Sequence, residues 1–165
     1  MQLLSLLSFC LIAFASCAQS KIAVSNTYGF LRQNSRGALA VDEKGGPINP
    51  GPDSQYIAYI EVPSAIEPVW TTAWINKQLY DVSGAKVTSP VIPGTGLNTA
   101  LKIELAATPG NNLWELSFQK GTPQPLPAKF TSAASTPMII KALYNKKEMF
   151  FEVKSISELD PIIYP

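Results

Sequence analysis

Short segments in which apolar and polar residues alternate are the dominant pattern after residue 20. A period of two over four to eight residues is typical of a strand with one buried and one solvated face. The clearest cases are residues 100–107 and 113–119, separated by the turn-forming segment 108–112. We predict that these two strands form a hairpin. Its inward-facing side chains are predicted to be Leu101, Ile103, Leu105, Trp114, Leu116 and Phe118.

Two further hairpins are predicted from the same alternation. The first covers residues 69–82 with its turn at Asn76-Lys77, and the second covers 138–155 with its turn around 145–147. Asparagine suits such turns because it tolerates a positive φ. Since side chains two apart on a strand share a face, Trp70 and Trp74 are predicted to lie on one face of the first hairpin. Other strands are expected at 54–62 and within 21–32.

These elements predict an all-β fold. No window keeps a helical apolar period, and prolines are spread from Pro47 to Pro165, which breaks long helices. Several short strands with regular turn signals favour a single antiparallel β-sandwich over residues 21–165, and an immunoglobulin-like arrangement is our first choice. Little or no helix is expected there. Long connections are expected at 42–53, 88–98 and 121–137.

The first residues differ from the rest. Residues 3–15 are thirteen consecutive residues without a charge, too few to cross a bilayer, which needs roughly 20. They fit the apolar region of a secretory signal peptide, which is typically about 7–15 residues long. Small residues follow at Ala15, Ser16 and Ala18, as a cleavage site requires. We predict that residues 1–16 form a signal peptide and that the protein is exported.

Cys17 extends this prediction. The segment Phe14-Ala15-Ser16-Cys17 resembles the lipobox of bacterial lipoproteins. The resemblance implies that Cys17 is lipidated, that residues 17–20 form an exposed tether, and that a membrane is a partner through the N-terminal lipid. It also implies a periplasmic or outer-membrane lipoprotein of a Gram-negative bacterium. The alternative is ordinary cleavage, for example after Ala18, and secretion without lipid.

The amino-acid composition limits the disulfides, catalytic groups and metal sites that the protein can contain. The only other cysteine, Cys10, lies in the segment to be removed, so the mature chain has no internal disulfide. The 165 residues include 13 basic and 12 acidic side chains and no histidine. Histidine-dependent catalysis and histidine-ligated metal sites are therefore excluded. A net charge of +1 does not favour a nucleic-acid partner. We expect no enzyme activity, no cofactor and no metal site.

Catalytic patterns are incomplete. Residues 83–86 have the S-x-x-K spacing, but they contain Gly84 and follow a predicted strand, whereas serine enzymes of that kind place the pair on a helix. We interpret 83–86 as an exposed turn, and the glycine-rich 43–46 and 94–96 likewise. Glu61 and Glu67 resemble a pair of catalytic acids only by proximity in sequence, and we interpret them as solvated.

Aromatic residues are the remaining candidates for a binding site. Exposed aromatic rings can stack on sugars or anchor a protein partner. The candidate ligand-binding residues are Trp70, Trp74 and Tyr80, although we expect both tryptophans to be buried. The sequence therefore predicts a lipid-anchored cell-envelope β-domain with a binding or structural role toward an envelope protein or glycan. The alternative is a secreted carbohydrate-binding module that uses exposed aromatics.

Overall fold

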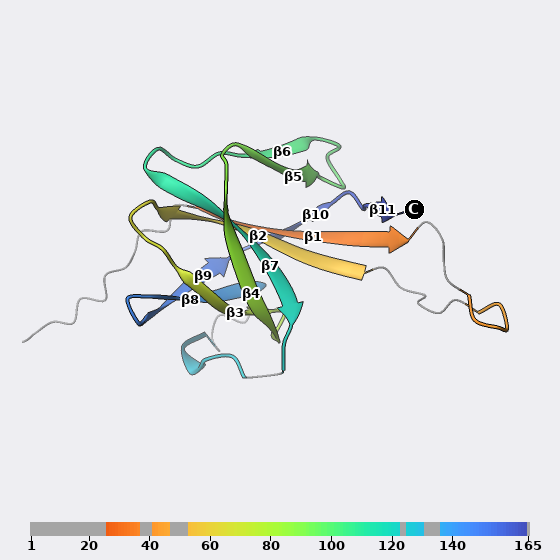
Figure 1. Cartoon of the computed structure of the whole chain (residues 1–165). Coiled ribbons are helices and arrows are strands. Elements are labelled where there is room, and N and C mark those ends of the chain that lie inside the picture. The colour runs from red at the N-terminus through yellow and green to blue at the C-terminus, as the bar shows by residue number, and fades with distance from the viewer. Residues whose placement is uncertain (1–25, 37–40, 47–52, 123–124, 131–135, 165) are drawn as a thin grey trace, which may run out of the picture.

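A computed structural model describes residues 26–36, 41–46, 53–122, 125–130 and 136–164 (Figure 1). These residues form eleven strands and one short 3-10 helix, η1. The elements are β1 (Thr27–Arg36), β2 (Asp53–Pro63), β3 (Val69–Ile75), β4 (Gln78–Val87), β5 (Val91–Thr95), β6 (Lys102–Leu105), β7 (Asn111–Lys120), η1 (Ala128–Phe130), β8 (Met138–Tyr144), β9 (Lys147–Val153), β10 (Ile156–Leu159) and β11 (Ile163–Tyr164).

Nine of these strands share one sheet. Its order is β10-β1-β2-β7-β4-β3-β8-β9, and β11 pairs with the end of β1. The pairings are antiparallel except those of β10 and β11, which run parallel to β1. The remaining two strands, β5 and β6, form a small second sheet that lies over one side of the large one (Figure 1).

The large sheet curls until its two ends approach each other. β9 lies at one end of the strand order, and after Lys154 and Ser155 the chain enters β10, which pairs with β1 at the other end. The hydroxyl of Thr27 in β1 donates to the carbonyl of Glu152 in β9 at 3.0 Å. At Gly29, a Cβ would lie 2.7 Å from a methyl carbon of Val153. A glycine there therefore lets β1 approach the strand that closes the curl.

The curl separates an inner face from an outer face. We call the apolar cluster on the inner face the inner core; its buried members are Ala58, Ile60, Val62, Trp70, Ala73, Ile75, Val82, Trp114, Leu116, Met138, Ile140, Ala142, Phe151 and Val153. Because these residues come from β2, β3, β4, β7, β8 and β9, every strand that contributes shows one apolar side to the same interior.

The outer face carries two smaller clusters. Under the small sheet, the outer cluster of β1, β2 and β7 contains Phe30, Ile57, Tyr59, Leu105, Leu113 and Leu159. Under the segment around η1, the outer cluster of β3, β4 and β8 contains Trp74, Leu79, Phe130 and Ile139. A curled sheet with a second layer over part of it is a sandwich-like all-β fold, as the sequence predicted. The strand order differs from an immunoglobulin-like sandwich, which divides its strands between two sheets of similar size.

Two of the three predicted hairpins are confirmed. β3 pairs with β4 and β8 pairs with β9. Both turns use an Asn-Lys pair with positive φ at each residue: 49° and 70° at Asn76 and Lys77, and 49° and 62° at Asn145 and Lys146. A two-residue turn of this kind matches the twist of the strands that it joins.

The predicted hairpin of 100–107 with 113–119 is wrong. β6 pairs with β5 in the small sheet, whereas β7 lies between β2 and β4. Of the side chains expected to point inward, Leu101 is 68% exposed. The reason is that β7 is buried on both faces, through Trp114 inside and Leu113 outside, so it takes a central position. The same pairing makes 91–95, expected to be part of a long connection, a strand.

Candidate functional site

Both candidate tryptophans are buried, as expected: Trp70 is 8% exposed and Trp74 is 6% exposed. They do not share a face, however, and that prediction is wrong. The register of β3 against β8 shifts between Trp70 and Thr72, so Thr71 is an extra residue in β3. A β-bulge of this kind reverses the alternation beyond it. Trp70 therefore belongs to the inner core and Trp74 to the outer cluster of β3, β4 and β8.

Trp70 packs in the centre of the inner core. Its ring lies 5.8 Å from that of Trp114, edge to face, and 5.2 Å from that of Phe151. A Cβ on Gly84 would lie 2.4 Å from the indole of Trp70 and 2.5 Å from Leu116, so only a glycine leaves room for the ring. The indole N–H groups of Trp70 and Trp114 have no hydrogen-bond partner among the described residues. The two rings are part of the packed core, and they present no exposed aromatic surface on which a sugar could stack.

Tyr80 is the one candidate aromatic that reaches the surface. It is partly buried against the inner core and contacts Tyr56 edge to face, with ring centroids 5.8 Å apart. Burial, and then the neighbouring Tyr56, raise the pKa of Tyr80 above its ordinary value. The side-chain amide of Asn76 lies 3.5 Å from the hydroxyl of Tyr56. The sequence missed Tyr56 and Asn76 as neighbours of Tyr80, because they come from a separate strand and a turn.

Glu61 is fully buried on the outer face, contrary to the expectation of a solvated acid. Its carboxylate accepts hydrogen bonds from the amides of Asn26 at 2.6 Å and Asn111 at 2.7 Å, and from the backbone N–H of Thr108 at 2.8 Å. Burial by itself would raise the pKa of Glu61, but the bonds from Asn111, Thr108 and Asn26 outweigh it and hold that pKa at about 2. The carboxylate is thus ionised and enclosed. It joins the start of β1 and the turn before β7 to β2.

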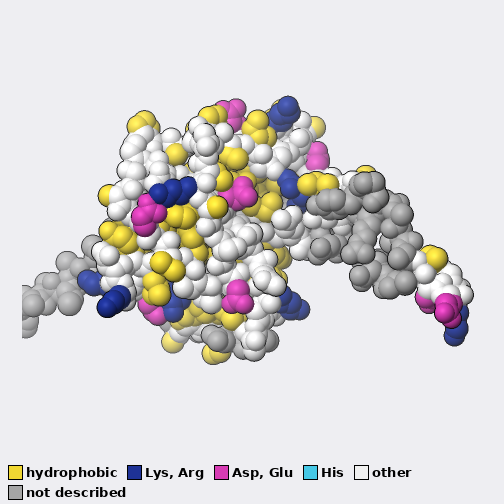
Figure 2. Space-filling view, viewed as in Figure 1, with side chains coloured by type: hydrophobic (Ala, Val, Ile, Leu, Met, Phe, Trp, Pro, Cys, Tyr) yellow, Lys and Arg dark blue, Asp and Glu magenta, His cyan; other side chains and the backbone are white. Residues whose placement is uncertain are grey.

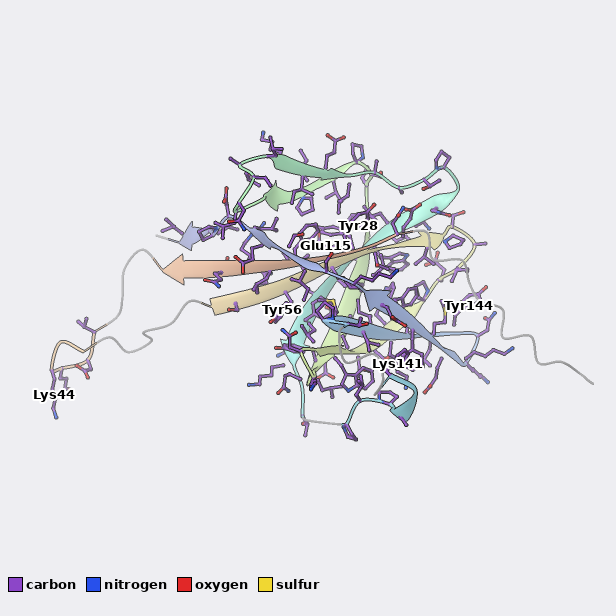
Figure 3. The ribbon with its side chains drawn as sticks, turned by 180° about the vertical axis from the view of Figure 1, so that it is seen from behind. Tyr28, Lys44, Tyr56, Glu115, Lys141 and Tyr144 are labelled. Atoms are coloured by element: carbon purple, nitrogen blue, oxygen red, sulfur yellow. The ribbon has the colours of Figure 1, made fainter. Side chains whose placement is uncertain are left out.

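A second polar group lies under the small sheet. The hydroxyl of Tyr59 donates to the carboxylate of Glu115 at 2.6 Å, and burial, followed by this bond, raises the pKa of Tyr59 well above its usual range. The guanidinium of Arg32 donates to the carbonyl of Pro93 in β5. The Tyr59–Glu115 bond joins the neighbouring strands β2 and β7 of the large sheet, whereas the bond from Arg32 in β1 to Pro93 attaches the small sheet to the large one. Figure 3 shows Glu115 beneath the small sheet, close to Tyr28 in the view.

The S-x-x-K segment is part of β4 and is not a turn, so that expectation is corrected. Ser83 pairs with Ser117, and their hydroxyls lie 2.8 Å apart. Lys86 forms an ion pair with Glu67 and lies 5.5 Å above the ring of Trp114. Because positions three apart on a strand point to opposite faces, Lys86 is not placed to activate Ser83. The two acids, Glu61 and Glu67, have separate partners and form no catalytic pair.

Several connections between strands lie at the end of the curled sheet where β1 begins. We call this end the N-terminal rim; it contains the connections 64–68, 108–110 and 145–146, and Asn26 lies there beside Glu61. The backbone N–H of Ser64 donates to the carbonyl of Gly110 at 2.9 Å, which joins two of these connections. Figure 3 shows Tyr144 at this end of the molecule and Lys44 at the opposite end.

The glycine-rich segment 43–46, interpreted from the sequence as a turn, lies apart from these groups. The carboxylate of Asp42 accepts from the backbone N–H groups of Lys44 and Gly46 at 2.9 and 2.7 Å, which fixes its own turn. Within the described ranges there is no cluster of three or more potential metal ligands, and no helix there is long and apolar enough to cross a bilayer. The predicted signal peptide, Cys17 and the tether 17–20 lie outside the described residues.

On the face seen in Figure 2, basic and acidic side chains are interspersed with apolar ones and do not gather into one charged patch. Comparisons of the chain with protein-family models, with curated proteins and with solved structures find no match. The functional argument therefore rests on the residues of this chain.

Proposed function

We propose that this protein is an exported cell-envelope domain, held to a membrane by lipid on Cys17, with a binding or structural role toward an envelope protein or glycan. The observation that carries the proposal is the position of Cys17 directly after a charge-free apolar segment and small residues. Removal of residues 1–16 would leave this cysteine as the first residue of the mature chain. A periplasmic or outer-membrane location in a Gram-negative bacterium follows from the same feature.

The fold is compatible with that processing. The buried residues of the inner core lie between Ala58 and Val153, and the sheet closes through β10 against β1. All of these residues lie outside the segment that would be removed, so the mature chain keeps every residue of the inner core.

The polar groups support a binding or structural role over catalysis. The carboxylate of Glu61 is enclosed and has three donors, so it is not available to a substrate. Ser83 and Lys86 point to opposite sides of β4. In an acid–base or nucleophilic enzyme, the nucleophile and its base must instead lie within hydrogen-bonding reach of each other.

Replacing Cys17 tests the proposal. We expect wild-type protein to incorporate labelled fatty acid and to partition into the detergent phase, because multiple acyl chains give stable anchoring. Cys17→Ser should lose the label and release the protein into the soluble fraction. Cys10→Ser is the matched control and should behave like wild type, since Cys10 lies within the segment to be removed. Wild-type protein that is soluble and unlabelled would refute the proposal.

A secreted carbohydrate-binding module is the second candidate. The observation that favours it is the edge-to-face pair of Tyr56 and Tyr80, which is partly exposed beside Asn76. Aromatic rings next to an amide suit the apolar face and hydroxyls of a sugar. This candidate predicts that Tyr80→Ala abolishes retention on polysaccharide columns, whereas Tyr144→Ala, at the other end of the molecule, does not. Equal retention of both variants would remove it.

A further inference from the structure

We infer that the partly exposed pair of Tyr56 and Tyr80, together with Lys120, binds a glycan that carries carboxylate groups. The inference rests on the proposed binding role toward an envelope glycan, and it adds the class of sugar and the residues that would select it. We call this surface the tyrosine site. Its residues are Tyr56, Asn76, Lys77, Tyr80, Phe118 and Lys120.

Three aromatic side chains lie together on the inner face of the curled sheet. Tyr56 near the start of β2, Tyr80 near the start of β4 and Phe118 near the end of β7 all pack against the inner core. β7 lies between β2 and β4 and is antiparallel to both, so its end lies beside the starts of the other two (Figure 1). The rings of Tyr56 and Tyr80 meet edge to face, with centroids 5.8 Å apart. All three side chains are half-buried, so the group is partly open to solvent.

Hydrogen-bonding groups border these rings. The side-chain amide of Asn76 lies 3.5 Å from the hydroxyl of Tyr56. The backbone N–H of Asn76 donates to the carbonyl of Pro137 at 2.9 Å, which anchors the turn to the chain that enters β8. Burial, and then the neighbouring Tyr56, raise the pKa of Tyr80, so its hydroxyl keeps a proton that it can donate. Apolar rings beside hydroxyl and amide groups match the apolar faces and the hydroxyls of a sugar.

The charge around the tyrosine site favours an anionic sugar. Lys120 is directly opposite Tyr80 in the register of β4 and β7, so the two side chains share a face. Lys120 and Lys77, which follows Asn76 in the turn, are exposed and form no ion pair within the described ranges. The inward-facing positions of β2, β4 and β7, as far as the structure describes them, contain no acid, and Asp81 faces outward. A carboxylate on a bound sugar would therefore meet positive charge without a competing acid.

The segment after β7 leads away from this surface. The backbone N–H of Gly121 donates to the carbonyl of Leu79 at 3.2 Å. Farther along, Leu126 and Phe130 pack with Leu79 in the outer cluster of β3, β4 and β8. The described part of this connection thus covers the outer face, in agreement with the exposure of Lys120.

The chain offers matched controls for both kinds of side chain. Lys102 is an exposed lysine of β6, in the small sheet over the outer face. Lys102→Gln and Lys120→Gln therefore remove the same charge from different faces. Tyr144 is a half-buried tyrosine at the turn of the other Asn-Lys hairpin, so Tyr144→Ala is a control for Tyr80→Ala. Tyr80→Phe keeps the ring that packs against the inner core, and it tests the hydroxyl even where Tyr80→Ala lowers stability.

The experiment measures the retardation of the mature acylated protein in native gels that contain polygalacturonate or its methyl ester. The ester has the same sugar chain without the charges. We expect wild type to bind polygalacturonate about tenfold more tightly than the ester. Tyr80→Ala should weaken binding to both polysaccharides about tenfold, and Tyr80→Phe about threefold. Lys120→Gln should weaken binding to polygalacturonate about fivefold and leave binding to the ester unchanged. Lys102→Gln and Tyr144→Ala should bind like wild type.

Equal affinity of wild type for polygalacturonate and for its ester would overturn the assignment of an acidic sugar. Equal weakening by Lys102→Gln and Lys120→Gln would indicate general charge attraction and overturn the site. Wild-type protein that carries the lipid and is retarded by neither polysaccharide would refute the inference and leave the proposed anchor intact. Labelling the same preparation with fatty acid tests that anchor separately.

Discussion

The inner and outer faces of the curled sheet both bury apolar side chains, but they exclude water in different ways. The inner core is one apolar cluster built from six strands, and its polar atoms include two indole N–H groups that have no partner in the described part of the chain. The outer face is divided between two clusters, each under its own cover. It also holds the two polar side chains that are buried among the described residues, Asn34 and Glu61.

The difference follows from how each face is closed. A sheet that curls on itself encloses its interior with side chains of its own strands, so apolar packing is enough. The outer face must be covered by other segments, and the backbone of those segments needs hydrogen-bond partners. The carboxylate of Glu61 accepts a hydrogen bond from the backbone N–H of Thr108, and the guanidinium of Arg32 donates one to the carbonyl of Pro93. On the outer face, these two polar side chains therefore hold the covering segments in place through hydrogen bonds to their backbone.

Truncation in the inner core should have the largest effect. Trp114→Ala removes a ring that packs against Trp70, and we expect a loss of about 3–5 kcal/mol in the free energy of unfolding. Phe118→Ala, a half-buried position on the same strand, should cost clearly less. Urea denaturation with an unchanged m-value measures both. Equal losses at the two positions would mean that the inner core extends further along β7 than the structure indicates.

Lowering the pH should destabilise the fold, because it protonates the buried carboxylate of Glu61 on the outer face. Its pKa is about 2 in the folded protein, against an ordinary value of 4.5. Because the folded value is the lower one, the ionised carboxylate stabilises the fold above about pH 5. That contribution, on the order of 3 kcal/mol, is lost as the pH falls toward 2. Glu61→Gln should flatten this part of the curve of stability against pH. A Gln variant with the same acid dependence as wild type would assign the effect to other carboxylates.

Gly84→Ala tests the packing of Trp70 against β4. The added methyl group would lie 2.4 Å from the indole and 2.5 Å from Leu116, which requires both side chains, or the backbone of β4, to shift. Overpacking of this kind typically costs about 1–3 kcal/mol. Gly110→Ala is a control for backbone strain alone, since its φ is 89° and its Cβ would have no atom within 4 Å. A thermal melt of Gly84→Ala that matches wild type would contradict the packing.

The smallest losses of stability are expected at two charged side chains, Glu115 and Lys102, which both alternate with apolar residues in the sequence. Glu115→Ala removes the acceptor of the Tyr59 hydroxyl and should cost about 1–1.5 kcal/mol. Lys102→Ala, on the exposed side of β6, should stay within about 0.5 kcal/mol. Calorimetry of the two variants measures the difference. A similar value for both would mean that the Tyr59–Glu115 bond adds nothing measurable to the pairing of β2 with β7.

Local pattern was sufficient for β2, β3, β4, β7, β8 and β9 and for two turns, but it did not predict β5, β10 or β11. The alternation in 113–119 identified β7, and the Asn-Lys pairs at 76–77 and 145–146 identified two hairpins. These features depend on side-chain period and on the tolerance of asparagine for positive φ, and both act over a few residues. The apolar segment before Cys17 is local in the same sense, and it remains the basis of the proposed function.

Tertiary structure decided what the strands pair with and what their side chains do. One extra residue at Thr71 places Trp70 and Trp74 on opposite faces, and no pattern in the sequence marks that bulge. Glu61 looks like any acid on a strand until Asn26, Thr108 and Asn111 converge on it from two distant segments. Strand order, registry and the partners of a buried charge depend on contacts between residues far apart in sequence. Those contacts form only when the sheet curls and its covers are in place.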